Sequence, residues 1–231
     1  MIQTQPTDTE PNSNGAARVL IVDDHPAVRE GLAARIAHLP DLDVCGEAAD
    51  IPQAKALMES AKPDVVVIDI SLKSGNGIDL IKWIRARHKK TRLLVCSMYP
   101  DSLYAERALR AGAHGYINKE NTTGHIVDAI RTVRDGRIFL SDESIERLVP
   151  RAVQTLPGYV PSPIKLLSNR ELDVFRRIGE GQTTTEIARH LDLSIYTIET
   201  YRRRIKIKLN LQSAVQLGRA ATQWVLEEKK D

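Results

Sequence analysis

Five polar side chains in the first half of the sequence could act together, although they lie far apart along the chain. They are the neighbouring Asp23 and Asp24, then Asp69, Ser97 and Lys119. Three carboxylates can hold a hard cation such as Mg²⁺, and one of them can act as a nucleophile. A hydroxyl and an ammonium group would face whatever that carboxylate accepts. These residue types predict a phosphoryl-transfer site.

Each of these residues follows an apolar, mostly β-branched run, which predicts how the fold would bring them together. The runs are residues 19–22 before the acidic pair, 65–68 before Asp69, 93–96 before Ser97 and 116–117 before Lys119. Short runs of this kind, separated by helical patterns, are typical of parallel strands buried on both faces. Ligands collect at the carboxyl edge of such sheets, so we expect the five side chains to meet there.

The sequence as a whole predicts two domains. Amphipathic helical patterns over 27–38, 52–61, 77–88, 102–112 and 122–135 alternate with the strands, and a short further strand is expected near Val44 and Cys45. This predicts an α/β fold with a doubly wound, five-stranded parallel sheet over residues 17–136. Residues 1–16 are polar and are expected to be a disordered leader, and the proline-rich residues 137–164 are expected to be a linker.

Residues 165–231 are helical by pattern and carry the positive charge. From Ser162 onward there are 13 Lys and Arg against 9 Asp and Glu, whereas the rest of the chain has 20 against 21. The sequences that begin at Ser168 and Thr183 have the form of a capping box, and Ser194 and Ser213 are good caps for two further helices, 195–209 and 214–226. Short connections between these helices predict an all-α helix-turn-helix domain of four helices that binds a polyanion.

The helix expected at 195–209 has an apolar back and a polar, basic front. Ile198, Tyr201 or Ile205, and Leu209 recur at helical spacing. The residues left outward are Glu199, Thr200, Arg202, Arg203 and Lys206. Such a helix fits the major groove of double-stranded DNA, where cations neutralise phosphates and polar side chains meet base edges.

Each of these features has a simpler explanation when it is taken alone. Asp23 and Asp24, or Asp69, could cap the turn after a strand, Ser97 and Lys119 could be ordinary surface residues, and the basic helix face could be merely solvated. The joint occurrence of polar residues at successive strand ends, and of the basic helix after a capped helix and a short turn, favours the functional interpretation.

Residues 18–136 resemble a CheY-like receiver domain of the two-component response regulators. The resemblance rests on VLIVDDHP from Val19 to Pro26, VVIDI around Asp69, Gly77, Ser97 and GYINK ending at Lys119. It implies that Asp69 is the phosphoacceptor and that Asp24 binds Mg²⁺ directly, with Asp23 acting partly through water. The Ser71 backbone carbonyl would complete the metal site, Ser97 and Lys119 would contact the phosphoryl group, and Tyr116 would be an aromatic switch that turns inward.

Two residues depart from that family's usual pattern. Lys73 stands where proline is usual, and Tyr99 stands where an acidic residue is common. Lys73 could loosen the loop or add charge near the metal, and Tyr99 could restrict the access of water. The lifetime of the phosphoryl group therefore does not follow from the resemblance.

Residues 165–225 resemble the LuxR-type helix-turn-helix of the NarL/FixJ response regulators. The matching segments are LSNRELDV from Leu167, EIAR from Glu186 and SIYTI from Ser194. The resemblance makes the third helix the recognition helix and gives the fourth helix a part in dimer contacts. Base-edge candidates are Glu199, Thr200 and Arg203, and phosphate candidates are Arg202, Arg204, Lys206 and Lys208.

The resemblances imply a DNA-binding response regulator. A sensor histidine kinase would phosphorylate Asp69, and the protein would bind double-stranded DNA, with homodimers expected on phosphorylation. The chain lacks a long apolar stretch and a signal peptide, so we expect a cytoplasmic protein without a membrane partner. It would not be an enzyme beyond assisting its own phosphorylation and dephosphorylation.

Two alternatives stay open. A phosphatase or phosphotransferase with an aspartate nucleophile usually needs a second aspartate two residues later, where Ser71 stands. A phosphorylation-independent transcription factor would use the receiver as a dimerisation module, and equal DNA affinity with and without the acyl phosphate would favour it.

Overall fold

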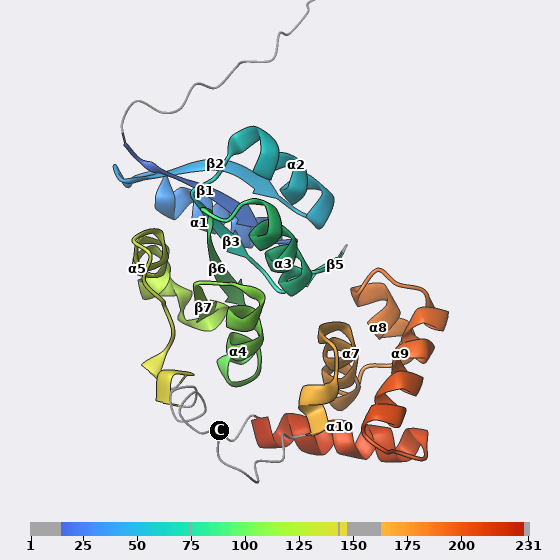
Figure 1. The fold of residues 1–231 in the computed structure, drawn as a ribbon. Coiled ribbons are helices and arrows are strands. Elements are labelled where there is room, and N and C mark those ends of the chain that lie inside the picture. The colour runs from blue at the N-terminus through green and yellow to red at the C-terminus, as the bar shows by residue number, and fades with distance from the viewer. Residues whose placement is uncertain (1–14, 74, 143, 147–162, 229–231) are drawn as a thin grey trace, which may run out of the picture.

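The chain forms an α/β part followed by a helical part (Figure 1) in this computed structural model, which describes residues 15–73, 75–142, 144–146 and 163–228. The α/β part contains β1 (Ala17–Val22), α1 (Pro26–Ile36), β2 (Leu42–Ala48), α2 (Ile51–Ala61), β3 (Val65–Ile68), β4 (Ser71–Leu72), β5 (Gly75–Asn76), α3 (Gly77–Arg87), β6 (Arg92–Ser97), α4 (Asp101–Ala111), β7 (Gly115–Asn118), the 3₁₀ turn η1 (Lys119–Asn121) and α5 (Thr122–Arg134).

Five parallel strands form the main sheet in the order β2-β1-β3-β6-β7. The central strands are buried on both faces, as the apolar runs predict: all four residues of β3 are inaccessible or nearly so. Helices α1 and α5 pack on one face of the sheet, and α2, α3 and α4 pack on the other (Figure 1). The predicted doubly wound, five-stranded parallel sheet is confirmed.

Two small features beside the sheet were not predicted. Strands β4 and β5 pair as an antiparallel hairpin directly after Asp69, with Ser71 opposite Asn76. After α5, Phe139 forms a parallel bridge with Gly115, and the Tyr116 N–H donates to the Phe139 carbonyl oxygen at 2.9 Å. The first residues expected to be linker therefore extend the edge of the sheet beside β7. Residues 147–162 and 1–14 lie outside the described residues.

The helical part contains η2 (Pro163–Leu166), α7 (Asn169–Gly179), α8 (Thr184–His190), α9 (Ile195–Lys208) and α10 (Ala214–Glu228). Both capping boxes have the predicted geometry: Ser168 and Glu171 cap α7 reciprocally, and Thr183 and Glu186 do the same for α8. These bonds satisfy backbone N–H groups that have no partner inside the helix. They fix where each helix begins, and the predicted four-helix domain is confirmed.

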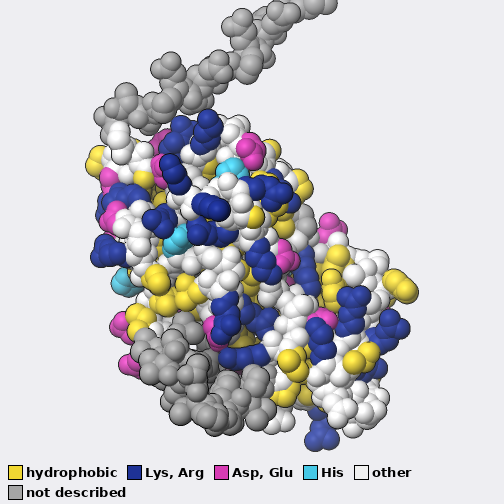
Figure 2. Space-filling view, viewed as in Figure 1, with side chains coloured by type: hydrophobic (Ala, Val, Ile, Leu, Met, Phe, Trp, Pro, Cys, Tyr) yellow, Lys and Arg dark blue, Asp and Glu magenta, His cyan; other side chains and the backbone are white. Residues whose placement is uncertain are grey.

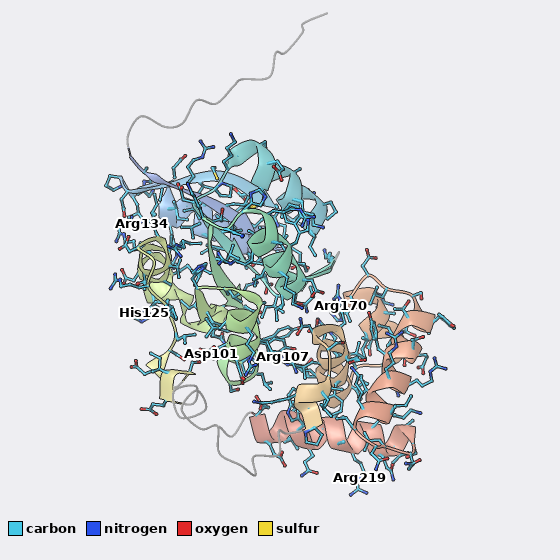
Figure 3. The ribbon with its side chains drawn as sticks, viewed as in Figure 1. Asp101, Arg107, His125, Arg134, Arg170 and Arg219 are labelled. Carbon is cyan, nitrogen blue, oxygen red and sulfur yellow. The ribbon has the colours of Figure 1, made fainter. Side chains whose placement is uncertain are left out.

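The α/β part and the helical part pack against each other. The Arg107 guanidinium on α4 donates to the carbonyl oxygens of Leu167 and Ile164 at 2.9 and 3.2 Å, and Figure 3 shows Arg107 at this junction. At the far end of α10, Glu228 accepts a hydrogen bond from Ser102 at 3.0 Å. A single apolar cluster runs from α2, α3 and α4 into α7 and α10. The two predicted domains therefore share a packed interface.

None of the helices in the described ranges is both long and apolar enough to cross a membrane.

Candidate phosphoryl-transfer site and nucleic-acid interface

The carboxylates of Asp23, Asp24 and Asp69 meet at the carboxyl edge of the sheet. Asp23 and Asp24 follow β1, Asp69 follows β3, and these two strands are neighbours. The Asp69 N–H donates to the Val22 carbonyl oxygen at 2.8 Å, so pairing continues up to the residues that carry the acids. One potential ligand atom from each of Asp23, Asp24, Asp69 and His25 lies within 4.8 Å of the others. The structure thus gathers the three predicted acids into one cluster.

Lys119 joins two of these carboxylates. Its Nζ atom lies 2.6 Å from Asp23 Oδ2 and 2.7 Å from Asp69 Oδ2, and its side chain is 8% exposed. Burial alone would lower the pKa of Lys119, but the Asp69 and Asp23 carboxylates outweigh it and raise the pKa. The lysine is therefore a fixed positive charge beside Asp69.

The Asp69 carboxylate is buried, and a negative charge is costly in such surroundings. Burial raises the pKa of the Asp69 carboxyl, and the nearby Asp23 carboxylate adds to the rise, while the ammonium of Lys119 and a hydrogen bond from Ser97 lower it. Desolvation makes an anion more reactive because less water must be removed before it attacks. A carboxylate held by one cation and one hydroxyl has the features of a nucleophile.

Ser97 ends β6, as predicted, and its side chain is fully buried. The Ser97 hydroxyl donates a hydrogen bond to Asp69 that lowers the pKa of the Asp69 carboxyl, and it accepts the Tyr99 N–H at 3.4 Å. The Tyr116 ring is completely buried, and its hydroxyl donates to the Tyr99 carbonyl oxygen at 2.8 Å. The aromatic ring expected to act as a switch therefore points inward in this structure.

The donor set fits a hard divalent cation. Asp24 Oδ1 is buried and accepts no hydrogen bond from the described residues, although His25 Nδ1 lies 2.9 Å from it. A buried carboxylate oxygen that accepts no hydrogen bond is costly, and a bound cation would relieve that cost. Ser71, the expected carbonyl ligand, is adjacent: its N–H donates to Asp69 Oδ1 at 3.3 Å.

His25 was missed by the sequence analysis. Its ring nitrogen Nδ1 lies 3.3 Å from Asp23 Oδ1, and its side chain is 64% exposed at the mouth of the acidic cluster. Its place directly after the acidic pair was the available signal. The same nitrogen lies 2.9 Å from Asp24 Oδ1, so the ring contacts both members of the acidic pair.

Gly77 shapes the loop that carries Asp69. A Cβ atom on this glycine would lie 2.1 Å from the Asp69 carbonyl oxygen, so only glycine permits this approach. The Gly77 N–H donates to the Ile70 carbonyl oxygen at 2.8 Å, which closes the loop around the β4–β5 hairpin. This contact gives a physical reason for the glycine on which the sequence resemblance partly rested.

The two departures from the usual receiver pattern have different surroundings. Lys73 is exposed, next to the hairpin. Tyr99 is only 7% exposed, and its hydroxyl donates to the Asp173 carboxylate of α7 at 2.5 Å. Tyr99 therefore connects the acidic site to the helical part.

The second candidate surface is the outward face of α9. Ile198 and Ile205 are fully buried and Tyr201 and Leu209 half-buried, which confirms the predicted apolar back. Ser194 caps the helix by accepting the Thr197 N–H at 3.0 Å. Figure 2 shows Lys and Arg side chains over α9, at the lower right.

The predicted DNA-contacting residues differ in how freely their side chains can reach a ligand. Glu199, Arg203 and Arg204 are exposed, Thr200, Arg202 and Lys206 are half-buried, and Lys208 is exposed but lies 2.5 Å from Glu171 of α7. The receiver contacts described above involve α4, η2, α7 and α10, so they leave the outward face of α9 open.

The acidic residue among the base-edge candidates is held in place. Glu199 Oε1 accepts a hydrogen bond from the Thr184 hydroxyl at 3.1 Å, and it lies 3.5 Å from Arg202 Nε. The Thr200 hydroxyl donates to the Tyr196 carbonyl oxygen at 3.0 Å. The carboxylate thus has a defined position on the polar face, between α8 and Arg202.

Two exposed apolar residues begin α9 and were not among the predicted contacts. Ile195 is 53% exposed and Tyr196 is 82% exposed. Tyr196 shares a helix face with Glu199, Thr200 and Arg203 because they are three, four and seven residues further on. Apolar side chains at this position can contact the methyl group of thymine. The sequence signal was their place directly after the capping serine.

Comparison with known proteins gives one family match for each of the two parts of the chain. Residues 19–131 match the family described as response regulator receiver domain, and residues 165–221 match that described as bacterial regulatory proteins, luxR family. The chain is 32% identical to the oxygen regulatory protein NreC of Staphylococcus epidermidis over 87% of this chain and 94% of that protein. It is 32% identical to the DNA-binding transcriptional activator DevR/DosR of Mycobacterium tuberculosis over 89% of this chain and 94% of that protein.

Solved structures are similar to part or nearly all of this chain. A LuxR-family two-component response regulator from Aurantimonas is 35% identical and covers 60% of this chain and 99% of its own, with a TM-score of 0.56. RcsB of Salmonella enterica, bound to promoter rprA in the presence of the phosphomimetic BeF₃⁻, is 25% identical, with a TM-score of 0.59. That similarity covers 90% of this chain and 98% of the RcsB chain.

Proposed function

This chain belongs to the two-component response regulators that join a receiver domain to a luxR-family DNA-binding domain, and on that basis we propose that phosphorylation of Asp69 controls its action on transcription. The phosphoryl donor would be a sensor histidine kinase. The observation that carries the proposal is Lys119 Nζ, held 2.7 Å from Asp69 Oδ2 and 2.6 Å from Asp23 Oδ2 in a buried pocket.

The Asp69 carboxylate would attack the phosphorus of a phosphohistidine. A new P–O bond forms while the P–N bond breaks, and the imidazole leaves as its nitrogen takes up a proton. Lys119 pairs with a phosphoryl oxygen, and the Ser97 hydroxyl donates a hydrogen bond to another. Fixed donors of this kind stabilise the charge of the transferring group without having to reorganise.

Asp23, Asp24, Asp69 and the Ser71 carbonyl would hold Mg²⁺. When bound, the ion neutralises phosphoryl oxygens as a Lewis acid. Asp24 Oδ1, which is buried and accepts no hydrogen bond from the described residues, supports this assignment. Asp69 and its neighbours would act on the chain's own acyl phosphate alone, so we do not propose a separate enzymatic substrate.

The DNA-binding domain would meet the major groove with α9. Its outward face supplies Glu199, Thr200 and Arg203 for base edges and Arg202, Arg204, Lys206 and Lys208 for phosphates. A protein that regulates bacterial promoters shares a compartment with the chromosome, so we propose a cytoplasmic location.

Helix α10 is the proposed dimer surface. Val215 and Leu226 are 72% and 56% exposed, and helical spacing places Arg219 between them on the same face. Figure 3 shows Arg219 on this helix. Exposed apolar side chains with a polar rim are typical of interfaces between proteins. The solved structure of two RcsB dimers on DNA, 24% identical to this chain, has the same overall fold. We propose that phosphorylation favours a homodimer through this helix.

The proposal is tested by incubating the full chain with acetyl phosphate and Mg²⁺ and measuring its intact mass. The wild type should gain one phosphoryl group and Asp69→Asn none. Asp79→Asn is the matched control because Asp79 lies 59% exposed on α3, away from the pocket. A phosphoryl group on the Asp69→Asn chain, or none on the wild type, would remove the assignment.

A further inference from the structure

Asp173 is a carboxylate of the DNA-binding domain that lies fully buried against the receiver. It is 0% exposed, and one of its oxygens accepts the Tyr99 hydroxyl at 2.5 Å. The other oxygen accepts the Asn76 side-chain amide at 3.3 Å and lies 3.8 Å from Arg170 Nη1. Two of these partners, Tyr99 and Asn76, belong to the receiver.

Tyr99 also contacts residues that surround the phosphoacceptor Asp69. Its hydroxyl lies 3.4 Å from Ser71 Oγ, in the loop directly after Asp69. Its N–H donates to Ser97 Oγ at 3.4 Å, and its carbonyl oxygen accepts the Tyr116 hydroxyl at 2.8 Å. The backbone of Tyr99 is thus held by the acceptor site, and its side chain reaches the DNA-binding domain.

The Tyr99 ring is also fixed on its faces. The Tyr104 ring stacks on it with centroids 4.6 Å apart, and the Arg176 guanidinium lies 4.6 Å from its centroid. Arg176 is on α7, as is Asp173. The orientation of the ring, with its hydroxyl beside Ser71, therefore depends on the hydrogen-bond acceptor that α7 supplies, which is the Asp173 carboxylate.

We propose that Asp173 is a positioning residue for the phosphoacceptor site: by accepting the Tyr99 hydroxyl, it holds the Tyr99 ring beside Ser71 and limits the access of water to the acyl phosphate on Asp69. This inference rests on the proposed phosphorylation of Asp69. Docking of the DNA-binding domain would then lengthen the life of the phosphoryl group.

The step that the ring restricts is hydrolysis. The oxygen of water attacks phosphorus, and the bond between phosphorus and the Asp69 carboxyl oxygen breaks. The carboxylate is regenerated, and inorganic phosphate leaves while the water proton passes to phosphate or solvent. Because the attacking water must approach phosphorus in line with the breaking bond, a bulky ring near that path slows the reaction without touching the nucleophile.

The buried carboxylate also makes the contact specific. A charge without water is tolerated only where hydrogen bonds and opposite charges replace its hydration. Asp173 receives these from Tyr99, Asn76 and Arg170, and burial still raises its pKa. Loss of the Tyr99 hydroxyl would leave one oxygen short of a partner, so the ring and the carboxylate stabilise each other's positions.

The test is a double-mutant cycle on the half-life of the acyl phosphate in the full chain. Wild type, Tyr99→Phe, Asp173→Ala and the double variant are phosphorylated with acetyl phosphate and Mg²⁺, freed of donor and followed by intact mass. Each single substitution should shorten the half-life by about fivefold, the size of a typical pairwise coupling, and the double variant should be no worse than either.

Tyr104→Phe is the matched control. The Tyr104 hydroxyl is buried and has no hydrogen-bond partner among the described residues, and its ring stacks on that of Tyr99. Removing this hydroxyl changes a neighbouring tyrosine without breaking the contact with Asp173. The half-life of Tyr104→Phe should equal that of the wild type.

A second measurement keeps the inference separate from the proposed function. Hydrogen exchange of the amides of Ser97, Met98, Tyr99 and Asp101 in the unphosphorylated chain should be faster in Tyr99→Phe and Asp173→Ala than in the wild type and Tyr104→Phe. Unchanged exchange and half-lives would overturn the positioning role. So would an Asp173→Ala effect that persists in full on the Tyr99→Phe background. If the wild type takes up no phosphoryl group, the proposed function is wrong, and so is the effect of this contact on the acyl phosphate. Faster exchange in the two variants would still show that the Tyr99–Asp173 contact holds the segment in place.

Discussion

The hydroxyl of Tyr116 donates a hydrogen bond to the carbonyl oxygen of Tyr99 at 2.8 Å. Tyr116 is the expected switch residue on β7, and Tyr99 lies between β6 and α4, so this bond spans two neighbouring strand ends. It places the switch ring inside the protein and connects it to the residue that reaches Asp173. The acceptor pocket and the domain interface therefore share one structural element, the 97–101 segment.

Replacing Tyr116 with Phe should remove this bond and keep the ring. Because a buried hydrogen bond contributes about 1 kcal/mol, the free energy of unfolding should fall by about that amount. Urea unfolding of the two chains measures the change. Phosphorylation by acetyl phosphate should persist, since the hydroxyl does not contact Asp69. A Tyr116→Phe chain that unfolds like the wild type would contradict the importance of the bond.

Mg²⁺ should stabilise the receiver against heat. A ligand that binds only the folded chain raises its stability by mass action, and saturating Mg²⁺ should raise the melting temperature by about 5 °C. Asp24→Asn should lose most of this rise because Asn offers a neutral ligand in place of the carboxylate. Asp79→Asn, at the exposed position on α3, should keep it. A full rise in Asp24→Asn would exclude that residue from the metal site.

His114 predicts a loss of stability in mild acid. Burial, with Arg92 and Arg85 nearby, lowers the pKa of His114 from 6.5 to about 4, and its Nδ1 accepts the Leu93 N–H at 3.1 Å. Between these values the unfolded chain binds a proton that the folded chain does not. Stability is therefore complete above about pH 6.5 and declines as the pH falls toward about 4.

His114→Asn supplies the control for this pH effect, because its side-chain oxygen can still accept the Leu93 N–H without titrating. Urea unfolding of both chains at about pH 7.5 and about pH 5 should show a larger loss for the wild type. Equal losses would show that His114 does not contribute.

Glu199 and Arg202 should affect DNA binding in different ways. Glu199→Ala should change the preferred sequence in a duplex library more than the salt dependence, because a carboxylate can accept from cytosine but repels phosphate. Arg202→Ala should reduce the slope of log affinity against log salt by about one unit if it contacts one phosphate. Arg110→Ala, 79% exposed on the receiver, is the control with the same loss of charge. An unchanged preference for Glu199→Ala would refute its role in base recognition.

The sequence was sufficient for the elements that repeat a simple pattern. The apolar run at 19–22 is the buried end of β1, the run at 65–68 is the whole of β3, and the capping boxes at Ser168 and Thr183 begin α7 and α8. Parallel strands align their carboxyl ends, so the sequence was enough to predict that Asp23, Asp69 and Lys119 lie at one edge of the sheet.

What sequence patterns could not supply are contacts between distant segments. The hydrogen bond from Tyr99 to Asp173 joins residues 74 positions apart, and neither residue type indicates from the sequence which residue it contacts. The pairing of Phe139 with Gly115 was hidden because a single residue that joins a sheet edge has no periodicity. His25 was missed because its exposed ring follows the acids outside any regular element. These features depend on how whole elements dock, which local patterns do not encode.

The most direct test of the central claim compares DNA binding by the phosphorylated and unphosphorylated chain. The full wild-type chain and Asp69→Asn are each treated with acetyl phosphate and Mg²⁺, and fragments of the source genome retained by each are footprinted and titrated. We predict that treatment raises the affinity of the wild type for its selected sites and leaves Asp69→Asn unchanged. Equal affinity of the treated and untreated wild type, with Asp69 shown to be phosphorylated, would contradict the account.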